Sequence, residues 1–482
     1  MLRPLAFAAL LACAASALAQ LPAPVSQLMA ASNIADDAIG VLVLRGDSAL
    51  VSHLAERPMQ PASTMKLVTT LVGLEQLGPV FRGRTELRSS APLIGDTLRG
   101  DLVLRGGADA DLSGEVLGAM LQALRNQGVR SIAGSLVLDR SLFNPARSDV
   151  GAAPFDESPD AYYNVIPDAL LVNKNMLLLD MRSNGARVQL AVQPALDRVS
   201  VESAFTLIDA PCARWEDGWK QPQIVRDANG TLRVLLQGTF PKNCVASNSI
   251  NVIDRQDYVD RLVRELWKRL GGEIAGPTVD GVAAPESRIL AEHVARSLPE
   301  VVRDINKPSD NALARTLFLS LGSLEADPLR GSRPMPGNGP TALRADMVVR
   351  DWLRARGIDD TGLVIENGSG LSRTEKISPL QMAGLLRAGL RSKWAPEFMA
   401  SLPIVGMDGT MRRRLKDSPA AERARMKTGT LRNVTAIAGY VPDANGQQCV
   451  VVAMINTERT TEGKGRLVLD ALVDWVARSG AQ

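Results

Sequence analysis

PASTMKLVTTLV, residues 61–72, predicts a turn that leads directly into an apolar helix. Ser63 and Lys66 are three residues apart, so a helix places their side chains on one face, within reach of each other. A serine hydroxyl needs a base beside it to act as a nucleophile. A lysine amine can be that base if burial and nearby positive charge lower its pKa. Taken alone, the stretch also fits a serine-capped helix with a surface lysine.

Two later stretches carry groups that would complete such a site. Ser309-Asp310-Asn311 precedes a helical pattern over residues 312–321, and Lys427-Thr428-Gly429-Thr430 opens a predicted strand. We expect Ser309 to pass a proton to a leaving amine, and Asn311 to hold a substrate amide and the head of Lys66. Taken alone, Ser309 could equally be an ordinary helix cap.

The predicted strand would supply the anion-binding part of the site. Lys427 would keep the site electropositive and attract a substrate carboxylate, which the Thr428 hydroxyl would bind. The backbone N–H groups of Ser63 and Thr430 would form an oxyanion hole. Gly429 would let the substrate backbone lie against the strand, where a Cβ would intrude.

A catalytic triad or a zinc site built on histidine is unsupported by the sequence, because the chain has only two histidines, His53 and His293. Neither has a metal-ligating partner at helical spacing, so we interpret both as structural. A serine–lysine pair is the nucleophile and base that remain. We therefore expect neither a metal nor a cofactor.

Composition and the first residues indicate an exported globular protein. Lys and Arg number 55 and Asp and Glu 52 among 482 residues, a net charge of 55 − 52 = +3 that is spread along the chain and predicts no nucleic-acid-binding stripe. Residues 1–19 have the basic start, apolar run and Ala17-Leu18-Ala19 ending of a signal peptide. A lipid anchor on Cys13 is the alternative. No later apolar run is long enough to be a transmembrane segment.

Three cysteines remain after the predicted signal peptide. Cys212 and Cys244 lie in loop-like sequence on either side of a probable strand over residues 232–240. We predict a disulfide between them, as exported proteins commonly contain. Cys449 begins an apolar run and is expected to be a small buried hydrophobe.

The pattern of elements predicts a mixed α/β (α+β) fold with an insertion. A hairpin of strands over 39–44 and 49–54 precedes the Ser63 helix, and strands over 435–441 and 448–456 precede a final helix over 466–478. Between Lys66 and Ser309 lie 242 residues, too many for a loop. We therefore expect a catalytic domain, residues 20–83 and 287–482, interrupted by a β-rich insert, residues 84–286, with a smaller nested domain.

Within these parts, several elements are specific enough to be checked. Inside the insert we expect a strand over 97–104 and amphipathic helices over 113–126 and 255–270. A helix over residues 288–298 would carry His293.

The motifs together resemble those of the penicillin-binding proteins of low-molecular-mass class C, the D-alanyl-D-alanine carboxypeptidase/endopeptidase branch. Ser63-Thr64-Met65-Lys66, Ser309-Asp310-Asn311 and Lys427-Thr428-Gly429 stand in that family's order, with its long gap after the first motif. Segments 134–139 and 366–373 are also similar to family motifs. The resemblance implies a β-lactamase/transpeptidase-like domain, with an antiparallel sheet flanked by helices. It also implies cleavage of D-Ala-D-Ala ends and D-alanyl cross-links of peptidoglycan stem peptides in the periplasm, and covalent trapping by β-lactam antibiotics.

The resemblance also implies residues that recognise the stem peptide. Asp156 fits the place of an acidic residue that faces the diamino acid side chain, and Arg373 resembles an arginine near the same pocket. Asp156 could equally be a loop acid that caps a turn. Arg432 stands where relatives commonly have glutamine, which leaves the peptide preference open.

Two other functions fit parts of the pattern. A serine β-lactamase needs fast deacylation, often by a positioned glutamate, and does not need the long insert. A non-catalytic penicillin- or peptidoglycan-binding sensor would keep the fold, but it would have no use for Lys66, Asn311 and Lys427.

Overall fold

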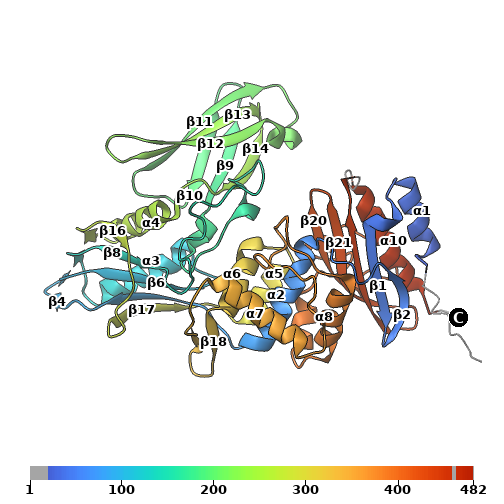
Figure 1. Ribbon diagram of the computed structural model, residues 1–482. Coiled ribbons are helices and arrows are strands. Elements are labelled where there is room, and N and C mark those ends of the chain that lie inside the picture. Colours follow the sequence, from blue (N-terminus) through green and yellow to red (C-terminus); the bar gives the residue numbers. More distant parts are fainter. Residues whose placement is uncertain (1–19, 459–462, 481–482) are drawn as a thin grey trace, which may run out of the picture.

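The computed structural model describes residues 20–458 and 463–480. The predicted signal peptide lies outside these residues. One five-stranded antiparallel sheet joins the two ends of the chain, as expected, and its strand order is β2-β1-β22-β21-β20 (Figure 1). The strands are β1 (Ile39–Arg45), β2 (Ser48–His53), β20 (Arg425–Leu431), β21 (Val434–Pro442) and β22 (Gln448–Asn456).

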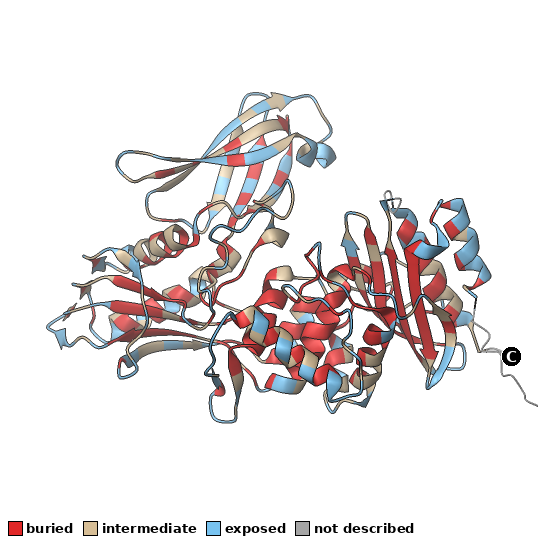
Figure 2. Ribbon diagram, viewed as in Figure 1, coloured by how far each residue is buried: buried red, intermediate tan, exposed pale blue. Residues whose placement is uncertain are grey.

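Both faces of this sheet are covered, which explains its nearly continuous apolar strands. Ala436 and Ala438 of β21 belong to the same hydrophobic core as helix α2 (Lys66–Leu77), whereas the alternate Ile437 and Val441 belong to the core that contains the last helix, α10 (Lys464–Arg478). Figure 2 shows buried residues filling the sheet and the helices beside it. The remaining helices of this part are α1 (Ala23–Ala31), α5 (Leu298–Asn306), α6 (Asn311–Leu321), α7 (Thr341–Arg354), α8 (Pro379–Arg391) and α9 (Ala395–Ser401). The expected fold class is confirmed.

The insert has a hydrophobic core of its own, built from several small sheets and two helices. A sheet of order β16-β8-β6-β3-β17 lies near α3 and α4, and the sheets β10-β9-β14 and β11-β13-β12 form the upper lobe of Figure 1. Its elements are β3 (Arg84–Ser89), β4 (Leu93–Ile94), β5 (Thr97–Leu98), β6 (Leu102–Gly107), α3 (Gly114–Asn126), β7 (Ser131–Ile132), β8 (Leu136–Asp139), β9 (Leu177–Ser183), β10 (Val188–Gln193), β11 (Val199–Ile208), β12 (Trp219–Arg226), β13 (Leu232–Pro241), β14 (Val245–Ile250), α4 (Arg255–Arg269), β15 (Glu273–Ile274), β16 (Thr278–Asp280) and β17 (Arg288–Val294).

Two expected elements differ from the structure. The helix expected over 288–298 is wrong, because residues 288–294 form β17, which pairs antiparallel with β3. The helix α5 starts later, after Ser297, which forms a capping box with Glu300. The strand expected over 97–104 is two strands, β5 and β6, which belong to different sheets.

Strand pairing bears on where the insert ends. Because β17 completes the sheet that contains β3, we propose that the insert runs from residue 84 to residue 294, rather than to residue 286 as the sequence suggested. The Cys212–Cys244 disulfide is present within it, and Cys449 is buried, so both cysteine predictions are confirmed.

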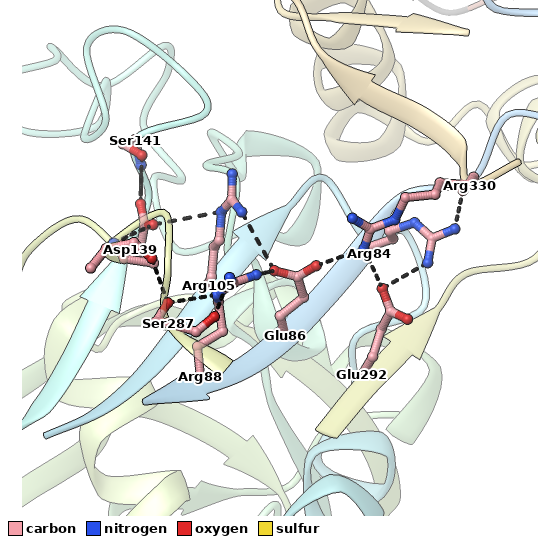
Figure 3. Close-up of polar contacts among 11 residues, drawn as sticks. Arg84, Glu86, Arg88, Arg105, Asp139, Ser141, Ser287, Glu292 and Arg330 are labelled. Carbon is pink, nitrogen blue, oxygen red and sulfur yellow. Dashed lines mark hydrogen bonds and ion pairs between the residues drawn. The ribbon is translucent and has the colours of Figure 1, made fainter. Parts of the chain in front are cut away.

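An ion-pair network joins the insert to the helical part of the chain. Arg330 lies in the turn between β18 (Leu324–Asp327) and β19 (Gly331–Pro334) and reaches Glu86 of β3 at 3.1 Å and Glu292 of β17 at 3.2 Å. Arg84 pairs with the same Glu292 at 2.7 Å (Figure 3). Several charges that share partners constrain a junction better than isolated surface pairs do.

Candidate active site

Ser63 lies in a single 3₁₀ turn, η2 (Ala62–Met65), which leads without a break into α2. Lys66 is the first residue of α2, and its Nζ lies 2.9 Å from Ser63 Oγ. Ala62 is held at φ +45°, an unusual value for a residue with a side chain, and the Thr64 hydroxyl donates to the Pro61 carbonyl at 2.8 Å. The turn is therefore fixed in a shape that presents Ser63 beside its predicted base.

The surroundings of Lys66 suit an uncharged amine. Nζ donates to Asn311 Oδ1 at 2.6 Å and to the Ser369 carbonyl at 2.5 Å. Both partners are acceptors only, so they use the two N–H bonds of a neutral amine. The lone pair then remains for the third neighbour, the Ser63 hydroxyl, which is the arrangement that a general base requires.

Burial and charge both favour this neutral form. Lys66 is fully buried, and desolvation lowers its pKa well below 10.5. Positive charge on Lys427 and Arg315 lowers the pKa further, whereas Glu375 and Asp310 raise it. Desolvation is the largest of these effects.

The segment that carries Ser309 and Asn311 is far along the chain from both Lys66 and Lys427, and it contacts both. Asn311 is the first residue of α6, and Ser309, held at φ +67°, lies just before that helix. Lys427 of β20 donates to Ser309 Oγ at 2.8 Å and to the Thr428 carbonyl at 2.9 Å. Burial lowers the pKa of Lys427 to about 7. The Ser309 hydroxyl therefore accepts a hydrogen bond from Lys427.

Strand β20 lies against the Ser63 turn. A Cβ on Gly429 would lie 2.5 Å from the Pro61 carbonyl oxygen and 3.1 Å from the Ser63 backbone nitrogen. Glycine is therefore required for the strand to approach the nucleophile, a role different from the substrate clearance that the sequence suggested. The Thr428 hydroxyl donates to Thr410 at 2.8 Å, and Thr430 is exposed.

Several groups that sequence reasoning missed belong to the loop 366–375. Glu375 is fully buried and accepts hydrogen bonds from the backbone N–H groups of Glu366, Asn367 and Gly368 at 2.8–3.1 Å. This fixes the loop that carries the Ser369 carbonyl to Lys66. The loop was noticed only as a family-like segment, because a backbone acceptor leaves no signal in residue type.

Asp156 contacts Tyr163, which also contacts the site residue Asn311, and Arg373 contacts Phe155, the neighbour of Asp156 in the chain. Tyr163 donates its hydroxyl to Asp156 at 3.0 Å, and its backbone carbonyl accepts from Asn311 Nδ2 at 2.9 Å. The Arg373 guanidinium stacks on the ring of Phe155, 4.4 Å from its centroid. Asp156 also accepts from the Ser158 backbone N–H, so it caps a turn as well.

Comparison with known proteins identifies the family. The profile of the D-Ala-D-Ala carboxypeptidase 3 (S13) family matches residues 21–479. The chain belongs to this family. The expected enzyme class, a serine D-Ala-D-Ala carboxypeptidase, is thereby confirmed.

Individual relatives agree with that assignment. The chain is 27% identical over 409 residues to the D-alanyl-D-alanine carboxypeptidase DacB of Haemophilus influenzae, with 83% of this chain and 80% of the relative covered. It is 28% identical over 423 residues to a D-alanyl-D-alanine carboxypeptidase of an Actinomadura species, with 85% and 76% covered.

A solved structure shares the fold. Penicillin-binding protein 4 (dacB) of Haemophilus influenzae superposes with a TM-score of 0.75 at 23% identity, over 94% of this chain and 99% of that one. A second structure of that protein contains a β-lactam and gives a TM-score of 0.71 at 24% identity, over 93% and 97% of the two chains. Among the described residues of the present chain, no helix is both long and apolar enough to cross a membrane.

Proposed function

We propose that this carboxypeptidase releases the terminal D-alanine of peptidoglycan stem peptides through an acyl-enzyme on Ser63. The observation that carries the proposal is the set of partners around the fully buried Lys66: when the amine is neutral, Asn311 and the Ser369 carbonyl use its two N–H bonds and its lone pair faces the Ser63 hydroxyl. Ser63 Oγ attacks the carbonyl carbon of the penultimate D-alanine, and its proton passes to Lys66. The backbone N–H groups of Ser63 and Thr430 receive the developing oxyanion.

The leaving amine needs a proton, and Ser309 is the group assigned to supply it. The Ser309 hydroxyl accepts from Lys427, so its own proton stays available for the leaving nitrogen. Lys427 replaces that proton. The terminal carboxylate of the substrate, bound by Thr428, favours the charged form of Lys427 before the reaction. After acylation Lys66 is protonated and Lys427 is neutral, so the protons balance.

Lys66 first returns its proton to Lys427 through solvent. It then takes a proton from an attacking water and delivers it to Ser63 Oγ as the acyl bond breaks, which restores the resting enzyme. We propose that D-alanyl cross-links are cleaved by the same steps, since only the leaving amine differs. Asp156 and Arg373 would face the diamino acid side chain of the stem peptide. We further propose that residues 1–19 direct the chain to the periplasm, where this substrate occurs.

β-Lactams are expected to acylate Ser63 and remain attached. The penicillin-binding protein 4 of Haemophilus influenzae, which shares the fold, has been solved with a β-lactam, and this supports the proposal. A D-Ala-D-Ala carboxypeptidase should release the penicilloyl group slowly, whereas a serine β-lactamase would release it rapidly. Cleavage of a peptide separates it from a sensor.

The test combines a disaccharide pentapeptide with a fluorescent penicillin. The wild-type chain should release D-alanine and keep a stable label, and Ser63→Ala should lose both while its melting temperature stays nearly unchanged. Rapid turnover of penicillin by the wild type would indicate a β-lactamase, and labelling without peptide cleavage would indicate a sensor. Persistent labelling of Ser63→Ala would mean that another residue is the nucleophile.

A further inference from the structure

Lys174 is a charged residue that the insert contributes to the edge of the catalytic site. Lys174 lies between β8 and β9, and its ammonium group pairs with the carboxylate of Asp310, the residue between Ser309 and Asn311. The other oxygen of the same carboxylate caps α6 by accepting from the Leu313 backbone N–H at 2.8 Å. Lys174 therefore contacts the residue that fixes the start of the helix carrying Asn311.

The backbone at Lys174 is held in an unusual conformation. Asn173, Lys174 and Asn175 have φ values of +48°, +52° and +58°, so three consecutive residues other than glycine adopt left-handed geometry. Left-handed geometry is strained for a residue with a side chain and persists only where the surroundings over-determine it. A run of three calls for a structural or functional reason.

The surroundings of this turn do over-determine it. Asn173 accepts from the Gly114 backbone N–H at 3.0 Å and donates to the hydroxyl of the buried Tyr258 at 3.1 Å. Asn175 donates to Asn251 and to the Ile253 carbonyl, both at 2.7 Å. Lys174, between the two anchored asparagines, has Asp310 as its ionic partner.

The charge of Asp310 matters to the base. Four charged groups act on the fully buried Lys66: Lys427 and Arg315 favour its neutral form, and Glu375 and Asp310 oppose it. A cation beside Asp310 offsets one of the two opposing charges. No other residue of the insert supplies an ionic partner to Asp310 within the described part of the chain.

We propose that Lys174 is a positioning residue for acylation: it fixes Asp310 at the start of α6 and neutralises its charge, so that Lys66 stays available as the base. The inference rests on the proposed function, because it concerns the acylation of Ser63. It gives the insert a direct part in catalysis, in addition to any binding of the stem peptide.

The experiment measures the second-order rate of penicillin acylation against pH for Lys174→Met and Lys174→Arg. Lys174→Met leaves Asp310 uncompensated, which raises the pKa of Lys66. The acidic limb of the profile should therefore move up by a few tenths of a pH unit to about one unit, and the rate at pH 7 should fall about two- to tenfold. Lys174→Arg keeps the charge and should restore the limb to its wild-type position.

Asp310→Asn provides the second variant, because it keeps a side-chain oxygen for the cap and removes the negative charge. Adding Lys174→Met to Asp310→Asn should move the acidic limb no further. Lys242→Met, which breaks an exposed pair with Asp209 in the same insert, is the matched control and should leave the profile unchanged.

The proposal is overturned if Lys174→Met lowers only the melting temperature, alters only saturation by peptide substrate, or leaves the acidic limb in place. It is equally overturned if the shift persists in the Asp310→Asn background. Failure of the wild-type chain itself to be labelled at Ser63 would instead refute the proposed function, so the two failures are distinguishable.

Discussion

Two fully buried lysines belong to this site, and burial lowers the pKa of both. Burial is the main cause for both Lys66 and Lys427, and the positive charge of Lys427 adds to the effect at Lys66. An amine that has lost its hydration is destabilising for the fold and useful for the reaction. The site thus gives up stability in return for a base that works near neutral pH.

Replacement of Lys427 by methionine should expose this trade-off. Burial lowers the pKa of Lys427 from 10.5 to about 7, so between these values the unfolded chain binds more protons than the folded one. The free energy of unfolding of the wild type therefore rises with pH across this window. Lys427→Met, which cannot be protonated, should have a higher melting temperature than the wild type at pH 6. The difference should shrink by pH 9, while penicillin acylation is largely lost at both.

Paired thermal scans at the two pH values check this expectation, with Lys242→Met as the control for loss of an exposed lysine. If Lys427→Met raises the melting temperature by the same amount at pH 6 and pH 9, protonation of the Lys427 amine does not destabilise the folded state. A lower melting temperature at both values would show that the lost hydrogen bonds to Ser309 and Thr428 dominate.

At the residue scale, the sequence predicted side chains well and backbone groups poorly. Ser63, Lys66, Ser309, Asn311 and Lys427 were predicted from their types and order. In the structure Lys66 is hydrogen-bonded to Ser63 and Asn311, and Lys427 to Ser309. The Ser369 carbonyl and the Tyr163 carbonyl were not predicted, since any residue type can supply a carbonyl. Lys174 was missed because its spacing from Ser309 along the chain carries no motif.

The close approach of β20 to the turn η2 is the feature at the scale of elements that makes the site possible. Gly429→Ala would place a methyl group 2.5 Å from the Pro61 carbonyl and 3.0 Å from the Ala62 Cβ. Because both neighbours belong to the turn that presents Ser63, the strand or the turn must move. We expect a loss of about 1–3 kcal/mol in stability and a much larger proportional loss of acylation rate.

Gly185→Ala is the matched control, since nothing lies within 4 Å of the Cβ that it would add and its φ is not left-handed. Penicillin labelling rates and denaturant unfolding of both variants give the comparison. Normal labelling of Gly429→Ala would show that the nucleophile tolerates displacement of the strand.

Elements with strong periodicity or caps were predicted well, but the edge strand β17 was not. The sequence pattern gave α3, α4 and the hairpin of β1 and β2 nearly to the residue. Residues 288–298 were expected to form one helix that carries His293. Pairing with β3 prevails instead, so residues 288–294 form β17, and the capping box at Ser297 sets the true helix start.

At the scale of the whole molecule, the insert carries its own covalent support. The Cys212–Cys244 bond closes a separation of 32 residues around the sheet β11-β13-β12, which corresponds to about 3–4 kcal/mol in the chain-entropy description. Because the bond lies in the upper lobe and away from Ser63, reduction should lower the thermal stability of the insert while penicillin acylation at 25 °C continues.

Differential scanning calorimetry with and without reductant, together with labelling of the reduced protein, checks this prediction. The double variant Cys212→Ser/Cys244→Ser serves as the control for side effects of the reductant. Equal stability of the oxidised and reduced forms would mean that the bond contributes nothing, and loss of labelling on reduction would mean that the insert controls the site more strongly than its contacts suggest.

The division of the chain into a catalytic domain and an insert stays a prediction, made because the gap between Lys66 and Ser309 is too long for a loop. The contacts that join the two parts had no signal in the sequence. The Arg330 network and the Lys174–Asp310 pair join residues far apart in sequence, and single charged residues on exposed elements give no sign of their partners.

The central sheet has one consequence for how the protein is made. Val41 of β1 pairs with Ala453 of β22, so this strand pair cannot form until both distant segments have been synthesised. Some contacts within the insert are more local, such as the pairing of β9 with β10, and can form while synthesis continues. A chain that emerges from a ribosome or an export channel therefore lacks the complete central sheet until β22 has emerged. A product truncated before β22 cannot form the active site.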